Sequence, residues 1–362
     1  MAERSRRVFA VRAVCAAFVA TLFVCALTPA VSLAAEAVPG QSTATSPPAP
    51  PPVPPPVAGR MRLVLQRTHG HPARAVVGQR FVVRGILTPY VAGQRIALSI
   101  YHDGRRVLSR RVGLTPLRGG AAAQFHFAYR PPHSGLLQVR AEHAATPQLA
   151  ALQAKPASVR YEPSQLSIGA GGTAVWILQD ELAALRYEVP VSGRFDEATG
   201  RAVLAFRKVA GQALLESVNS RIFQLLQEGA GRYRVRFPQD GNHVEADLTR
   251  QVLVEVEHGR VRRILTMSSG KPSTPTVIGH FYVYSKTPGV NTEGMVDSNY
   301  FIRGYAIHGY AEIPPYAASH GCLRIPIPDA AAVFTWVQVG YAVDVYTESG
   351  RGSHVVRPNA GP

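Results

Sequence analysis

The sequence is poor in cysteine. Only three of its 362 residues are cysteines, and two of these, Cys15 and Cys25, lie in an apolar N-terminal stretch. The scarcity excludes a disulfide-rich scaffold, because such a fold needs several paired cysteines. Cys322 is then left without a partner and is a candidate reactive thiol. Histidines and a glycine surround it, which argues against the alternative of a small buried core residue.

Lysine and acidic residues are also few. The chain has 39 Lys and Arg against 23 Asp and Glu, a net charge of +16, and only Lys155, Lys208, Lys271 and Lys286 are lysines. A nucleic-acid partner is not expected, because no basic helix or aromatic–basic repeat accompanies the charge. The charge favours instead an anionic surface such as a cell envelope, which would attract the chain through a salt-screened field.

Residues 1–35 predict a secretory signal. Four arginines precede an apolar run from Ala13, and Ser32-Leu33-Ala34-Ala35 offers small residues for cleavage. Removing its net charge of +3 leaves +13 on the mature chain. The uncharged run over 13–35 is also long enough to span a bilayer, so an uncleaved membrane anchor is the alternative. Either way the chain is expected to be exported.

Two segments predict little structure of their own. Residues 36–59 contain three proline runs between Pro47 and Pro56 and predict an extended linker, because such a composition cannot build a packed core. Residues 348–362 predict a flexible tail. The remaining chain is expected to be multidomain and mainly β.

Residues 60–162 predict a small β-sandwich. Apolar and polar residues alternate, with the inward sets Ile96, Leu98, Ile100; Phe125, Phe127, Tyr129; and Leu137, Val139, Ala141. Asp103-Gly104 marks a tight hairpin. The pattern resembles bacterial immunoglobulin-like domains, and we expect this domain to act as a spacer or docking module.

Residues 173–228 change to a helical period. Val175, Leu178, Leu182 and Leu185 recur three or four apart, and Asp196 is a candidate N-cap for a following helix. The segment resembles the small three-helix peptidoglycan-binding domain. The alternative is a helical spacer that binds nothing.

The C-terminal region returns to strands. Tyr233, Val235 and Phe237 alternate with arginines, and a hairpin turning at His258-Gly259 is expected to open a β-rich domain over residues 247–347. A short helix is expected after Pro328.

The candidate site lies in this β-rich domain. It combines Ser319-His320-Gly321-Cys322-Leu323-Arg324 with the upstream Ile307-His308-Gly309. A free thiol with a pKa of about 8.5 is mostly protonated at neutral pH, so an imidazole beside it would make it a better nucleophile. Gly321 permits a sharp backbone turn, and Arg324 is suited to binding a carboxylate. Together these residues indicate a cysteine acyl-transfer site.

These residues resemble the signature of the L,D-transpeptidases, which carry the YkuD-type catalytic domain. The resemblance includes Ser269-Gly270, Thr274-Pro275-Thr276 and Gly279-His280-Phe281 upstream. It implies a β-rich catalytic fold that forms peptidoglycan cross-links. Cys322 would hold a stem peptide as a thioester, with release of D-alanine, until an amine of a second stem accepts it. Donor and acceptor stems are thus the implied partners, with no cofactor and no metal.

The resemblance also assigns roles around Cys322. His308 is the implied general base, oriented by the carbonyl of Gly309, and His320 is the second candidate. Backbone N–H groups near Gly321 and Cys322 would form an oxyanion hole, with Ser319 among the supporting residues. Arg324 would bind substrate or brace the loop.

Tyr305 would line the donor groove. The expected oligomeric state is a monomer.

Three alternatives remain open from the sequence. The same thioester would release its acyl group to water in an L,D-carboxypeptidase. A decayed catalytic domain would leave a non-catalytic peptidoglycan-binding protein. A zinc site built from His308, His320 and Cys322 is the third, although the spacing lacks the paired cysteines or histidines that such sites use.

Overall fold

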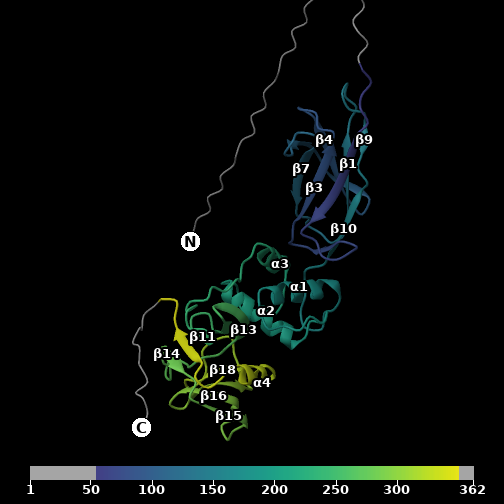
Figure 1. Cartoon of the computed structure of the whole chain (residues 1–362). Helices are drawn as coiled ribbons and strands as arrows, with labels where there is room; N and C mark the ends of the chain where they lie inside the picture. Colours follow the sequence, from purple (N-terminus) through teal and green to yellow (C-terminus); the bar gives the residue numbers. More distant parts are fainter. Residues whose placement is uncertain (1–53, 350–362) are drawn as a thin grey trace, which may run out of the picture. The chain divides into compact units, whose positions relative to one another are not determined.

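The structure, a computed structural model, describes residues 54–349. The predicted signal at 1–35, most of the predicted linker at 36–59 and nearly all of the predicted tail at 348–362 lie outside these residues. Between residues 54 and 349 no helix is both long and apolar enough to cross a membrane. Figure 1 shows a β domain, a helical domain and a second β-rich domain in sequence order.

The β domain has two sheets around one core. One sheet has the order β1 (Arg60–Gln66), β3 (Phe81–Thr88), β7 (Ala123–Tyr129), β6 (Thr115–Pro116). The other has the order β2 (Arg74–Val76), β10 (Ala157–Glu162), β8 (Gly135–His143), β4 (Arg95–His102), β5 (Arg105–Gly113), with β9 (Leu152–Gln153) beside β8. The predicted alternation is confirmed on β4 and β8, where Ile96, Leu98, Leu137 and Val139 are fully buried. The relation to immunoglobulin-like domains stays a prediction.

The hairpin between β4 and β5 turns at Asp103-Gly104, as predicted. Both residues have positive φ, 47° and 84°. This backbone matches the right-handed twist of paired strands, and glycine adopts it without steric cost.

The helical domain consists of α1 (Thr173–Ala184), α2 (Glu197–Val209) and α3 (Ser220–Gln227). Asp196 caps α2 as predicted, because its carboxylate accepts the N–H of Thr199 at 2.8 Å. The inward residues Val175, Leu178 and Leu182 are fully buried. The predicted helical period is therefore correct, while peptidoglycan binding by this domain stays a prediction.

The C-terminal domain has two sheets. The first has the order β13 (Arg260–Thr266), β12 (Val252–Glu257), β11 (His243–Asp247), β19 (Ala342–Tyr346), β14 (Gly279–Tyr282). The second has the order β15 (Ser285–Val290), β16 (Val296–Ile302), β17 (Tyr305–Tyr310), β18 (Leu323–Pro326), and α4 (Ile327–Trp336) follows β18. The predicted turn at His258-Gly259 joins β12 to β13, with φ of 50° and 73°.

One sequence prediction in this region is wrong. Tyr233, Val235 and Phe237 do not form a strand. The backbone N–H groups of Arg236 and Phe237 donate instead to the carboxylate of Glu245, both at 2.7 Å, and the hydroxyl of Tyr233 also bonds to it. A side chain on β11 thus takes the hydrogen bonds that a neighbouring strand would have made.

Strand β12 joins two cores because its side chains alternate. Leu253 points into the core of the C-terminal domain, with Phe281 and Ile307. Val252 and Val254 point the other way, into a core shared with Phe206 and the rest of the helical domain. Helix α2 accordingly lies against β13 (Figure 1). The helical domain therefore packs against the first sheet of the C-terminal domain, through β12 and β13.

Candidate active site

Neighbouring strands carry the candidate residues. β17 and β18 are parallel, and their register pairs Ile307 with Leu323 and His308 with Arg324. Register partners project from the same face of a sheet, and Cys322 precedes β18 directly, two residues before Arg324. The opposite face, with Ile307 and Leu323, belongs to the core. The ladder thus brings the base candidate and the nucleophile candidate to adjacent strands.

His308 is buried, with 2% of its surface exposed. Its Nδ1 lies 2.9 Å from the carbonyl oxygen of Gly309. A carbonyl only accepts, so Nδ1 carries the proton and Nε2 is left as a free acceptor in the neutral ring. Burial is the main reason why the pKa of His308 lies below its ordinary value; the Gly309 contact opposes this, and the charge of Arg324 adds to it.

Cys322 is partly buried, and its thiol points toward the carbonyl of Gly304, with Sγ 3.8 Å from that oxygen. Burial raises the pKa of the thiol, while the backbone of Ala306 and the cation of Arg324 lower it. The lowered pKa of His308 and the raised pKa of Cys322 both favour a neutral thiol and a neutral imidazole over an ion pair.

Ser319 shapes the turn before Cys322. Its hydroxyl donates to the carbonyl of Cys322 at 2.6 Å and accepts the N–H of Gly321 at 3.0 Å. The Gly321 N–H is thus already bonded inside the loop, and the predicted oxyanion hole near Cys322 stays a prediction for the other backbone N–H groups.

The upstream segment with Ser269, Gly270 and Thr276, which contributed to the resemblance, is hydrogen-bonded to the loop before Cys322. The carbonyl of Ser269 accepts the N–H groups of Ala318 and Ser319, at 2.8 and 2.9 Å. The hydroxyl of Thr276 accepts the N–H of Gly270 at 2.9 Å and donates to the carbonyl of Gly321 at 2.8 Å. The segment around Thr274-Pro275-Thr276 thus acts here as a scaffold for the cysteine loop.

Glycine is required at two of the candidate positions. A Cβ on Gly309 would lie 2.7 Å from Cβ of Ala330, so the close packing of α4 on β17 needs a glycine there. A Cβ on Gly321 would lie 2.0 Å from a ring carbon of Tyr305. Tyr305 therefore packs directly on the turn before Cys322.

His320 is bonded outside the pair formed by His308 and Cys322. Its side chain is exposed, and its Nε2 is 3.1 Å from Nζ of Lys271. The zinc alternative required His308, His320 and Cys322 to converge, and the structure does not bring these three together. In residues 54–349 the side chains close enough to share a metal ion are Asp240, His280 and Asp344, where Nδ1 of His280 is 2.6 Å from Asp344.

Arg324 is half-buried, and its guanidinium lies over the ring of Tyr310, 3.9 Å from the centroid. Within the described part of the chain it forms no ion pair with a carboxylate. Tyr310 also contacts the ring of His308 edge-on, at 5.7 Å. The sequence analysis missed Tyr310, although its position two residues after His308 on a strand would have placed it on the same face.

Residues 241–345 match the family model described as the L,D-transpeptidase catalytic domain, YkuD. Through this segment the chain belongs to the YkuD family. The match begins six residues before the predicted boundary at 247, because β11 is a central strand of the first sheet. It includes every candidate residue from Tyr305 to Arg324.

Solved L,D-transpeptidases resemble the chain to different extents. A crystal structure from Xylanimonas cellulosilytica is 33% identical, over 51% of this chain and 98% of that one, with a TM-score of 0.47. The catalytic domain from Enterococcus faecium acylated by ertapenem is 28% identical, over 29% of this chain and 97% of that one, with a TM-score of 0.26. The comparison with curated proteins gave no match.

Proposed function

We propose that the chain is an exported peptidoglycan L,D-transpeptidase that acts through a thioester on Cys322. YkuD membership supports an enzyme that modifies peptidoglycan. The observation that carries the proposal is the tautomer of His308: Nδ1 is bound to the Gly309 carbonyl, so Nε2 is a free base on the strand beside the one that follows Cys322.

The first step makes the acyl-enzyme. Sγ of Cys322 attacks the carbonyl between the third residue and the terminal D-alanine of a tetrapeptide stem while Nε2 of His308 takes the thiol proton. Because the resting pair is neutral, proton transfer accompanies the attack. The C–N bond then breaks, the amine of D-alanine receives the proton, and a thioester remains on Cys322.

The second step transfers the acyl group. The side-chain amine of a neighbouring stem attacks the thioester and loses a proton to His308, and the thiol is restored as the new amide forms. The half-buried Arg324, with no described carboxylate paired to it, is suited to binding a stem carboxylate. Tyr305, packed on Gly321, would border the donor stem.

The decisive experiment incubates the soluble protein with disaccharide-tetrapeptide and analyses the products by mass spectrometry. The parent should give cross-linked dimer and free D-alanine, and Cys322→Ala should give neither. Free D-alanine and tripeptide without dimer, even with added amine acceptor, would establish the L,D-carboxypeptidase instead. A carbapenem adduct on Cys322 is expected, since ertapenem acylates the E. faecium domain. Absence of both adduct and turnover would favour a non-catalytic binding protein.

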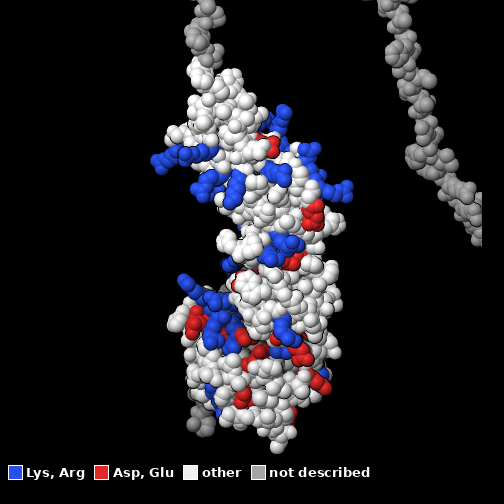
Figure 2. All heavy atoms as spheres, turned by 90° about the vertical axis from the view of Figure 1, so that its right-hand side faces the viewer, with Lys and Arg blue, Asp and Glu red and all other residues white. Residues whose placement is uncertain are grey.

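We further propose that the β domain holds the enzyme on an anionic envelope. Strand β5 is an edge strand, and Arg105, Arg106, Arg110 and Arg111 on it are all exposed. Figure 2 shows basic side chains gathered on the β domain, in the upper part of the view, with few acidic ones. Binding to isolated cell walls should fall as salt rises, and replacing these four arginines by glutamine should weaken the binding and reduce its salt dependence.

A further inference from the structure

Lys208 belongs to the helical domain, but its ammonium group is bound by the catalytic domain. Nζ donates to the carbonyl of Gln251 at 2.9 Å, to Oγ1 of Thr266 at 2.7 Å and to the carbonyl of Met267 at 3.0 Å. A lysine ammonium has three N–H donors, so these contacts satisfy all of them. All three acceptors lie where β12 begins and β13 ends, so Lys208 joins α2 to one point of the catalytic domain.

Burying the ammonium group of Lys208 between two domains costs free energy, because the charge loses its hydration. Lys208 is 6% exposed, and no carboxylate in the described chain pairs with it. Burial lowers its pKa to about 7. An apolar side chain of similar volume would commonly give equal or greater stability at such a place. A contribution to the fold alone therefore explains this lysine poorly.

Gln251 connects Lys208 to the loop before Cys322 through hydrogen bonds of its backbone and side chain. Its side chain holds Ser269 at both ends: Nε2 donates to the Ser269 hydroxyl at 2.7 Å, and Oε1 accepts the Ser269 N–H at 2.8 Å. The carbonyl of Ser269 in turn accepts the N–H groups of Ala318 and Ser319. Since the hydroxyl of Ser319 bonds to the carbonyl of Cys322, the chain of contacts reaches the nucleophile.

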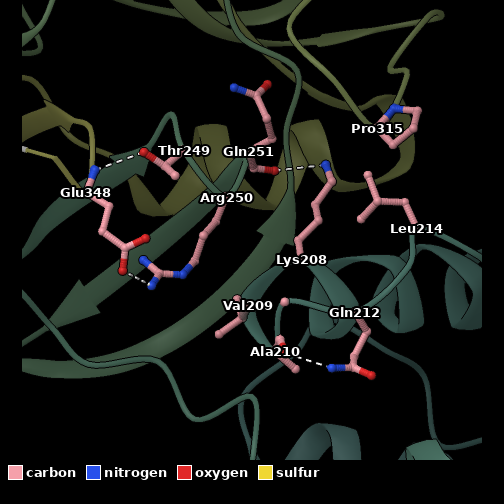
Figure 3. Close-up of a pocket in the computed structure, with 11 residues that line it drawn as sticks. Lys208, Val209, Ala210, Gln212, Leu214, Thr249, Arg250, Gln251, Pro315 and Glu348 are labelled. Carbon is pink, nitrogen blue, oxygen red and sulfur yellow. Dashed lines mark hydrogen bonds and ion pairs between the residues drawn. The ribbon is translucent and has the colours of Figure 1, made fainter.

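Figure 3 shows Lys208 extending from α2 to the Gln251 carbonyl beside a pocket of about 510 Å³. Leu214 of the helical domain and Pro315, from the connection between β17 and β18, also line the pocket. At this edge of the junction the hydrogen bonds of Lys208 join α2 to Gln251, beside the shared core in which Phe206 packs with Val252 and Val254.

We propose that Lys208 is a positioning residue for acyl transfer, holding the Cys322 loop in its reactive geometry through Gln251, Ser269 and Ser319. The proposal rests on the proposed function of Cys322, but Lys208 itself touches neither the nucleophile nor a substrate. The helical domain is then a working part of the active site as well as a neighbour of it.

The test compares Lys208→Met with Arg207→Met in the full soluble chain. Arg207 is the adjacent residue of α2 and is 5% exposed, but its guanidinium donates to the carbonyls of Ala213 and Ser217, inside the helical domain. Both variants lose a buried cation, and only Lys208→Met loses the link to the catalytic domain. Arg207→Met is thus a matched control for damage to the helical domain.

We expect Lys208→Met to lower kcat about ten- to a hundredfold, because displacements of about 1 Å can have effects of that size, with KM within about twofold. Arg207→Met should leave kcat within about twofold at a temperature where both variants are folded. Adding Gln251→Ala, which removes both side-chain contacts to Ser269, to Lys208→Met should lower kcat much less than Gln251→Ala does alone, because both variants interrupt one chain of contacts. Equal kcat for Lys208→Met and the parent, or equal losses in both methionine variants, would overturn the proposal.

A second readout does not depend on peptidoglycan. The rate of Cys322 alkylation by iodoacetamide should change in Lys208→Met and stay at the parent value in Arg207→Met. If the parent fails to turn over stem peptides, the proposed function fails, while these alkylation rates still decide the role of Lys208. If Lys208→Met does not fold, Lys208→Gln, which keeps an amide donor, is compared with Arg207→Gln in the same way.

Discussion

Gly321 and Tyr305 are in contact so close that no side chain fits between them. A Cβ on Gly321 would lie 2.0 Å from Cε1 of Tyr305, and the φ of Gly321 is +123°. Gly321→Ala must therefore move the ring or the backbone beside Cys322. We expect kcat to fall at least about a hundredfold, since the turn sets the position of the sulfur. Stem-peptide turnover measures this, with circular dichroism to establish folding.

A second substitution tests whether the clash with Tyr305 causes the effect of Gly321→Ala. Tyr305→Ala removes the ring that the new methyl group would meet, so the double variant should recover part of the melting temperature lost in Gly321→Ala. Full activity in Gly321→Ala would show that the turn does not position the nucleophile.

His308→Gln and His320→Gln should behave differently. His308 has Nε2 free and lies on the strand beside Cys322, whereas His320 is exposed beside Lys271. Loss of a general base lowers rates by about 10²–10⁴, so we expect that effect on kcat for His308→Gln and less than about threefold for His320→Gln. Steady-state kinetics on the tetrapeptide decides, and the reverse order would move the base to His320.

Arg324→Gln should make the thiol less acidic. The guanidinium lowers the pKa of Cys322, so its removal raises that pKa and leaves less thiolate at neutral pH. The pH at which iodoacetamide alkylation reaches half its maximal rate should move up. KM for the tetrapeptide should also rise if Arg324 binds a carboxylate. Arg324→Lys keeps the charge and serves as the control for the pH effect. An unchanged alkylation profile in Arg324→Gln would show that Arg324 does not lower the pKa of the Cys322 thiol.

Lys208 should make stability depend on pH. Its pKa in the folded chain is lowered to about 7, below the value of about 10.4 expected when unfolded. Between these values the unfolded chain binds more protons, so the free energy of unfolding should rise with pH relative to Lys208→Met. Urea unfolding at pH 7, 8 and 9 measures the difference. Parallel curves for parent and Lys208→Met would contradict the burial of the ammonium group.

Local patterns predicted the helices and the hairpins. The N-cap at Asp196 and the turn at Asp103-Gly104 depend on residues next to each other, which the sequence displays directly. The motif around Cys322 was recognisable for the same reason. The structure adds the pairing of β17 with β18, which explains why His308 lies on the strand adjacent to Cys322 despite the intervening connection.

Contacts between distant segments were not predictable. Lys208 stood out only as one of few lysines, and nothing near it indicated Gln251 or Met267 as partners. The occupied N–H of Gly321 depends on the rotamer of Ser319, and the conformation near Tyr233 depends on Glu245 from a later strand. Each of these features is decided by tertiary packing, which periodicity does not encode.

The parallel pairing of β17 and β18 makes the register of the two strands independent of the connection between them. The register between the strands is fixed by the ladder and by the packing of α4 on Gly309, while residues 311–318 cross between them. We therefore expect substitutions in that crossing to leave the register of His308 with Arg324 unchanged. Exchanging residues 311–317 is therefore expected to change the surface beside the candidate site while the strands stay in register, as long as Ala318 and Ser319 keep their hydrogen bonds to Ser269.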